Sequence, residues 1–307
     1  MIPESPVDAV DPQGLIARLK RHTSPLAPIP TEQQPRLWRL PHIRALLFDV
    51  YGTLFISASG DIGTSDIEAH GRALGQVMEA LKITVDHNTA VRAATTLVQA
   101  IIRTHEQLKD QGRTYPEVDI RTIFLEVLGY LRSKGVVLEE SSRQFCEILA
   151  VEYECRINPT WPMPGLADTL QCLRERGNLL GIVSNAQFYT PLLFPAHLDQ
   201  TLESLGFDPD LCVWSYRHLE AKPSPNLFRR ALEALQRRGI EPAQVLYVGN
   251  DRINDVWPAA QSGMRTALFA GDRRSFRPRR EDLRGRDMRE DVVLTEFSQL
   301  LEVLDAD

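Results

Sequence analysis

The chain has 307 residues, 43% of them hydrophobic and 25% charged, which is typical of a globular protein with a sizeable core. Its net charge of -6 argues against a nucleic-acid partner. No apolar run approaches the roughly 18 residues of a membrane-spanning helix, and the acidic N-terminus does not resemble a signal peptide. We therefore expect a cytoplasmic protein that neither binds nor crosses a membrane.

The first 42 residues are rich in proline and lack sustained periodicity, apart from a possible short helix at residues 13–21. We expect residues 1–42 to form an N-terminal extension that either wraps the surface or stays mobile. The sequence gives no sign of the oligomeric state.

Short apolar runs typical of buried strands begin at residue 44 and recur towards the C-terminus. Helical patterns follow most of them, including residues 224–238, 255–262 and 296–304. This alternation predicts an α/β fold with a Rossmann-like, doubly wound parallel sheet. The expected strands are residues 44–48, 179–183, 211–214, 245–248, 266–269 and 292–294.

The alternation stops after the first strand, where about 100 residues have helical patterns and almost no strand signal. We expect residues 56–162 to form an inserted, all-helical cap domain. Residues 43–55 and 163–307 would then form the α/β core domain. The Pro-Met-Pro-Gly run at 162–165 is the expected hinge back into the core, and such hinges let a cap close over a site.

Polar side chains follow the ends of the first two long strands. Asp49 comes directly after the first strand, and Ser184 and Asn185 come directly after residues 179–183. Taken alone, each could be a turn former or a helix cap. Because ligands bind outside the carboxyl ends of strands in open α/β sheets, each could also contact an anionic ligand.

Lys222 and a group of acids follow later strands. Lysine is rare in this chain, and Pro223 restricts the backbone after Lys222, which suits a fixed cation, although a surface lysine is the alternative. Asp251 and Asp255 follow the strand at 245–248 and lie four residues apart. With Asp49 they would crowd three carboxylates, which favours a bound cation, and oxygen ligands suit Mg²⁺.

These four elements, in this order, resemble the motifs of the haloacid dehalogenase (HAD) superfamily of hydrolases, with a cap of the C1 type. The resemblance implies that Asp49 is the nucleophile and forms a covalent aspartyl intermediate that water hydrolyses. It implies that Ser184 and Lys222 bind the transferred group. In the phosphatase branch it also implies Mg²⁺ held by Asp49, by the backbone carbonyl of Tyr51 and by an acid of the fourth motif, with a small molecule as substrate.

Tyr51 departs from the phosphatase pattern. Most phosphatases of the superfamily carry an aspartate there, which protonates the leaving group, and loss of a general acid costs about 10²–10⁴-fold in rate. The metal-independent 2-haloacid dehalogenases carry the same Asp-x-Tyr-Gly-Thr pattern, which adds Thr53 to the candidate catalytic residues. A non-catalytic ligand-binding protein is a further alternative.

The fourth motif favours the phosphatase instead. The dehalogenase branch has a different sequence there, and its cap arginine has no counterpart in this chain. Asn250 takes the place of the usual acid, so Asn250, Asp251 and Asp255 all remain candidates for the metal site. We therefore expect Mg²⁺-dependent hydrolysis of a small phosphorylated metabolite.

Three further features have two interpretations each. Residues 115–119 either face the site and select a cationic or hydroxyl-bearing leaving group, or only form a capped turn that opens the next helix. The arginine-rich residues 273–289 form either a solvated loop or a contact with a substrate anion. The four cysteines lack metal-ligand spacing, so we expect buried free thiols, with metal binding or redox chemistry as the alternative.

Overall fold

The computed structural model describes residues 12–58, 66–138, 143–285 and 288–304. The core is a six-stranded sheet with the order β5-β4-β1-β6-β7-β8, in which every neighbouring pair is parallel. All six expected strands are confirmed: β1 (Ala45–Phe48), β4 (Leu179–Ser184), β5 (Phe207–Trp214), β6 (Val245–Gly249), β7 (Arg265–Phe269) and β8 (Val292–Leu294).

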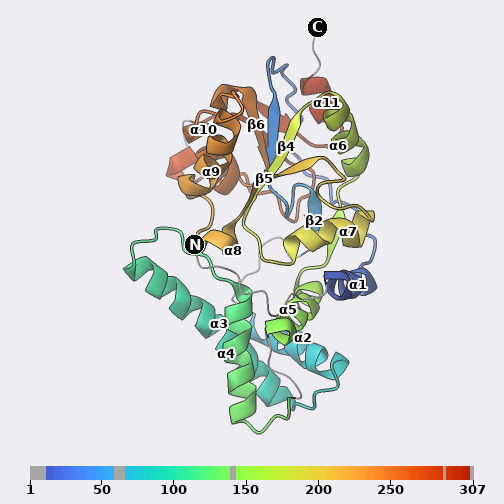
Figure 1. The fold of residues 1–307 in the computed structure, drawn as a ribbon, viewed down its shortest axis with the longest axis vertical. Coiled ribbons are helices and arrows are strands. Elements are labelled where there is room, and N and C mark those ends of the chain that lie inside the picture. Colours follow the sequence, from blue (N-terminus) through green and yellow to red (C-terminus); the bar gives the residue numbers. More distant parts are fainter. Residues whose placement is uncertain (1–11, 59–65, 139–142, 286–287, 305–307) are drawn as a thin grey trace.

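Helices cover both faces of the sheet (Figure 1). Alternate residues of β1 face opposite sides, so Leu46 and Phe48 join one hydrophobic cluster while Ala45 and Leu47 join the other. The first cluster includes residues of α6 (Leu166–Glu175), α7 (Leu193–Leu198) and α11 (Gln299–Val303), and the second includes residues of α9 (Pro225–Gln236) and α10 (Trp257–Gln261). This arrangement is the predicted doubly wound fold.

Four long helices lie between the first and second strands of the core and project below it in Figure 1. We call these the cap helices: α2 (Ile67–Ala80), α3 (His87–Asp110), α4 (Ile120–Ser133) and α5 (Arg143–Ile157). Their buried faces meet around Phe124 and Tyr153, whose ring centroids are 5.7 Å apart. We propose that they are the cap domain expected over residues 56–162.

Two short strands, which the sequence does not predict, join the cap helices to the core. β2 (Phe55–Ser57) leads into the cap helices, β3 (Thr160–Pro162) leads out, and the two pair antiparallel. At three residues each, these strands are too short to give a periodic signal. The interval expected to be purely helical therefore begins and ends in a small sheet.

The proline-rich N-terminus lies along the surface over its described part, which we call the N-terminal strap (residues 12–42). It begins with α1 (Pro12–His22), which buries Leu15 and Leu19 against α5 and α7. Further on, the amide of Leu40 donates to the carbonyl of Val303 over 2.9 Å. The strap thus contacts both a cap helix and the core.

The remaining short helices of the described core are α8 (Ser215–His218), the 3₁₀ turns Thr190–Leu192, Pro242–Gln244 and Leu283–Gly285, and the π-helical turn Arg252–Val256. The four cysteines form no disulfide, and Cys146 is buried as expected, whereas the other three are only partly buried. Among the described residues, no helix has the length and apolar character needed to span a membrane.

Candidate active site

Asp49 lies at the carboxyl end of β1, in the middle of the sheet, with Ser184 at the end of the neighbouring strand β4. The Oγ of Ser184 donates to Asp49 Oδ1 over 2.8 Å. Ser184 itself is fully buried. The two side chains are brought together because the parallel strands end at the same edge of the sheet.

Lys222 connects Asp49 to the acids that follow β6. Its Nζ lies 2.6 Å from Asp49 Oδ1 and 2.5 Å from Asp255 Oδ1, and it donates to the Tyr247 hydroxyl over 3.2 Å. Burial lowers the pKa of Lys222, but the two carboxylates outweigh burial and hold that pKa above its ordinary value. Burial raises the pKa of Asp255 to about 7, and Lys222 offsets part of this rise. Lys222 therefore stays charged and compensates both acids.

Asn185 holds the backbone of Lys222 rather than its side chain. Its Oδ1 accepts from the Lys222 amide over 2.6 Å, and its Nδ2 donates to the Lys222 carbonyl over 3.4 Å. Asn185 also lines the cavity described below. It fixes the position from which the lysine reaches Asp49.

Asp251 begins the π-helical turn after β6 and accepts from the amides of Ile253 and Asn254. The guanidinium of Arg279 covers the same carboxylate, with Nε 2.8 Å and Nη2 2.7 Å from Oδ2. Arg279 belongs to the arginine-rich stretch at 273–289, so part of this stretch lies in the site. A paired guanidinium and carboxylate of this kind is a strong, oriented contact.

Asn250, the residue in place of the usual acid, is held from two sides. Its Oδ1 accepts from Thr53 Oγ1 over 3.2 Å, and its Nδ2 donates to the carbonyl of Ser275 over 2.6 Å. Gly52 packs against it with φ +84°, and a Cβ there would come within 2.6 Å of the Asn250 Nδ2. Thr53 is fully buried and lies behind the site. Thr53 therefore supports Asn250 from the side away from the cavity.

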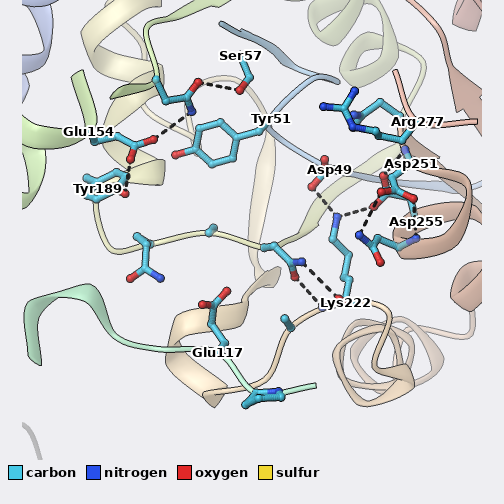
Figure 2. Close-up of a pocket in the computed structure, with 18 of the residues that line it drawn as sticks. Asp49, Tyr51, Ser57, Glu117, Glu154, Tyr189, Lys222, Asp251, Asp255 and Arg277 are labelled. Atoms are coloured by element: carbon cyan, nitrogen blue, oxygen red, sulfur yellow. Dashed lines mark hydrogen bonds and ion pairs between the residues drawn. The ribbon is translucent and has the colours of Figure 1, made fainter. Parts of the chain in front are cut away.

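Tyr51 points its hydroxyl away from Asp49, towards Thr190, whose Oγ1 lies 3.0 Å away. In the view of Figure 2 the ring lies between Asp49 and Glu154. Burial raises the pKa of Tyr51 well above its ordinary value, and Glu154 adds to this rise more than Asp49 does. The phenol therefore stays protonated at neutral pH.

A cavity of about 470 Å³ opens over Asp49 (Figure 2). We call its charged side next to the sheet the floor, made of Asp49, Lys222, Asp251, Asp255, Arg277 and Arg279. We call the opposite side the wall, made of His105, Glu117, Glu154, Asn158, Gln187 and Tyr189.

The wall residues were missed by sequence reasoning, with one partial exception. The sequence allows two interpretations of residues 115–119, and in the structure each one fits a different part of the segment. Asp119 caps α4 by accepting from the Arg121 amide, whereas Glu117 lines the cavity. The other wall residues carry no motif that would single them out in one sequence.

The chemistry of the floor suits a hard cation, because the carboxylates of Asp49 and Asp251 line one cavity. Asn250 lines the same cavity, and its amide oxygen accepts from Thr53. Within the described ranges, however, no group of three or more His, Cys, Asp or Glu residues is arranged as a metal site. Asp255 is occupied by Lys222 and by the amide of Asp251. A metal bound to Asp251 would have to displace Arg279 from its carboxylate.

A family model for haloacid dehalogenase-like hydrolases matches residues 43–263. The chain belongs to this family of hydrolases. The match covers most of the core and all of the cap helices. The resemblance inferred from the four motifs is therefore confirmed.

Relatives within the family include phosphatases. The chain is 28% identical over 225 residues to the phosphoglycolate phosphatase of Escherichia coli, covering 72% of this chain and 79% of the relative. It is 25% identical over 205 residues to the glyceraldehyde 3-phosphate phosphatase of Pyrococcus furiosus, covering 61% and 78%. A solved structure of a defluorinating L-2-haloacid dehalogenase shares the fold, with a TM-score of 0.51, 20% identity and coverage of 88% and 100%.

Proposed function

We propose that this hydrolase cleaves small phosphate esters through a covalent intermediate on Asp49, with Mg²⁺ as cofactor. The observation that carries the proposal is the environment of Asp49 Oδ1, which accepts from both Ser184 and Lys222. Among the residues that the structure describes, Asp49 Oδ2 accepts no hydrogen bond. One oxygen is thus held while the other is open towards the cavity.

In the first step, Asp49 Oδ2 attacks phosphorus and the bond from phosphorus to the ester oxygen breaks, so the leaving group departs as an oxyanion that takes up a proton from water. In the second step, water attacks the aspartyl phosphate, which releases phosphate and restores the carboxylate. Lys222 neutralises charge on the transferred phosphoryl group, with Ser184 and Asn185 holding Asp49 and Lys222 in place. The cation of Arg277, which also lines the cavity, is a further contact for phosphoryl oxygens.

Mg²⁺ would be held by Asp49, the Tyr51 carbonyl and either Asn250 or Asp251, with Asp255 reserved for Lys222. When bound, it would supply additional positive charge to stabilise the phosphoryl group. This assignment rests on the oxygen donors of the floor and on the phosphatase relatives.

Tyr51 limits which esters react well. Its hydroxyl is turned towards Thr190 and remains protonated, so it is poorly placed to give a proton to an alkoxide near Asp49. Esters with good leaving groups do not need that proton. We expect aryl phosphates to react at least about 10²-fold faster than simple alkyl phosphates.

The test is hydrolysis of 4-nitrophenyl phosphate with Mg²⁺ and with EDTA, for the wild-type chain and for Asp49→Asn. Activity that needs Mg²⁺ and disappears in Asp49→Asn is the expected result. Activity that persists in EDTA would contradict the metal assignment, and activity that persists in Asp49→Asn would contradict the nucleophile.

A second candidate function is metal-independent dehalogenation of 2-haloacids, which Tyr51 favours because a halide leaves without protonation. Within the described residues no arginine of the cap helices lines the cavity to receive the substrate carboxylate. Halide release from 2-chloropropionate in EDTA, with no hydrolysis of aryl phosphate, would favour this alternative.

A further inference from the structure

The wall of the cavity carries two carboxyl groups, Glu117 and Glu154, that no cation among the described residues compensates. Floor and wall enclose the same 470 Å³ space, so a substrate whose phosphoryl group lies on the floor places its leaving group against the wall. The charged groups of the wall therefore help to determine which leaving groups the cavity accepts.

Glu117 is held by neutral groups. Its Oε1 accepts from the Val118 amide and its Oε2 accepts from Ser215 Oγ, each over 2.9 Å. Its own segment is fixed to the core, because the Glu117 amide donates to the carbonyl of Leu219 and the Ala221 amide donates to that of Tyr115. Glu117 is thus presented to the cavity by a rigid loop.

Glu154 has the same kind of environment. The Tyr189 hydroxyl donates to its Oε2 over 2.9 Å, and Asn158 Nδ2 donates to its Oε1 over 3.1 Å. Ser57 donates to the Oδ1 of this asparagine over 2.8 Å, which fixes the amide orientation. Burial raises the pKa of both Glu117 and Glu154, because no nearby positive charge offsets the cost of burying a carboxylate.

The cations of the cavity are all on the floor. Lys222 is paired with Asp49 and Asp255, and Arg279 is paired with Asp251. In the part of the chain that the structure describes, neither glutamate of the wall forms an ion pair. The buried Nε2 of His105, which also lines the wall, has no hydrogen-bond partner there. The two glutamates therefore line the cavity with neutral hydrogen-bond donors as their partners.

We propose that Glu117 and Glu154 are specificity-determining residues that select phosphate esters whose leaving group carries a protonated amine. This inference rests on the proposed function and adds the chemical class of the leaving group. An ammonium group donates three hydrogen bonds and supplies the missing positive charge. A leaving group with a carboxylate would instead place like charges together, at a site with no cation to receive it.

The proposal separates this chain from its phosphoglycolate phosphatase relative, because phosphoglycolate carries a carboxylate on its leaving group. The same reasoning disfavours 2-haloacids. The family resemblance alone therefore does not transfer the substrate of that relative.

The experiment compares three two-carbon phosphate esters that differ at one end: phosphoethanolamine, 2-hydroxyethyl phosphate and phosphoglycolate. Their dissociation constants are measured by calorimetry in the presence of Mg²⁺, with the Asp49→Asn full-length chain so that no ester is consumed. We expect phosphoethanolamine to bind most tightly and phosphoglycolate most weakly, with at least about tenfold between them.

Two variants test the residues. Adding Glu117→Gln and Glu154→Gln keeps the shape of the wall and removes its charge, so the preference for the ammonium ester falls to within about twofold. The matched control is Glu175→Gln, an exposed position on α6 outside the cavity, which keeps the full preference. Each single glutamine variant is measured as well, with its circular dichroism spectrum, so that misfolding of one protein does not decide the result.

Phosphoglycolate binding as tightly as phosphoethanolamine would overturn the proposal, as would an unchanged preference in the double glutamine variant or no binding of any ester. Failure of the proposed function is distinct. Absence of turnover with every ester, together with the expected order of binding, would retain the amine-selective wall and reject phosphate hydrolysis.

Discussion

The floor and the wall of the cavity treat charge in opposite ways. On the floor, carboxylates are matched by cations at short range, with Lys222 between Asp49 and Asp255 and with Arg279 on Asp251. On the wall, Glu117 has only neutral hydrogen-bond donors. The carboxylates of the floor already have positively charged partners before substrate binds. The glutamates of the wall do not, and an ammonium group of the substrate can provide that charge.

The largest effect is expected from Lys222→Met, which removes the positive charge that lies between Asp49 and Asp255 on the floor. Two buried carboxylates would face each other without a cation, which costs about 3–5 kcal/mol of unfolding free energy. Hydrolysis of 4-nitrophenyl phosphate should fall by at least about 10²–10³-fold, since the phosphoryl group loses its stabilising charge.

Chemical denaturation measures the change in stability, and the double variant Lys222→Met with Asp255→Asn is its control. That double variant should recover part of the lost stability without recovering activity. Equal stability of wild type and Lys222→Met would contradict the stabilising ion pairs of Lys222 with Asp49 and Asp255.

A smaller effect is expected from Arg279→Gln, which frees Asp251 from its guanidinium. If Mg²⁺ uses this carboxylate, removing the competing cation should lower the Mg²⁺ concentration for half-maximal thermal stabilisation several-fold. The contact is partly exposed, which keeps the effect modest.

Arg280→Gln is the matched control, since that neighbouring arginine contacts Gln33 instead. Unchanged Mg²⁺ dependence in Arg279→Gln would assign the metal to Asn250 rather than Asp251.

The smallest effect is expected from Glu152→Gln, away from the cavity on α5. Glu152 is a buried acid like those of the wall, but basic side chains surround it. Burial raises the pKa of Glu152, but hydrogen bonds from Arg156, Arg18 and His22 outweigh burial and lower the pKa from 4.5 to about 2. A depressed pKa contributes stability above pH 4.5 that is lost as the pH falls towards 2.

Urea unfolding between pH 7 and pH 3 should therefore show a steeper loss of stability in wild type than in Glu152→Gln. Parallel pH profiles for the two proteins would contradict a role for this acid in holding the strap.

The strand ends of the core could be predicted from the sequence because parallel strands bring their carboxyl ends to one edge. Asp49, Ser184 and Lys222 follow from that rule together with their order in the chain. The three are in hydrogen-bond contact in the structure.

The wall could not be predicted in the same way. Glu154 is one of three glutamates within eight residues of α5, and only the docking of that helix onto the core decides that it meets Tyr189. Arg279 lies in an irregular segment whose path no periodicity describes. Helix docking and loop paths depend on tertiary packing, which a single sequence does not encode locally.

The β2–β3 pair has a mechanical consequence. The two connections between cap helices and core are hydrogen-bonded to each other, so they form one ribbon instead of two independent linkers. A ribbon resists shear between its strands but bends across its plane, which restricts the cap helices to tilting as a unit. Such a tilt would move Glu154 on α5 together with Ser57 on the ribbon but away from Tyr189 of the core, so opening the leaving-group side of the cavity requires the loss of the hydrogen bond from Tyr189 to Glu154.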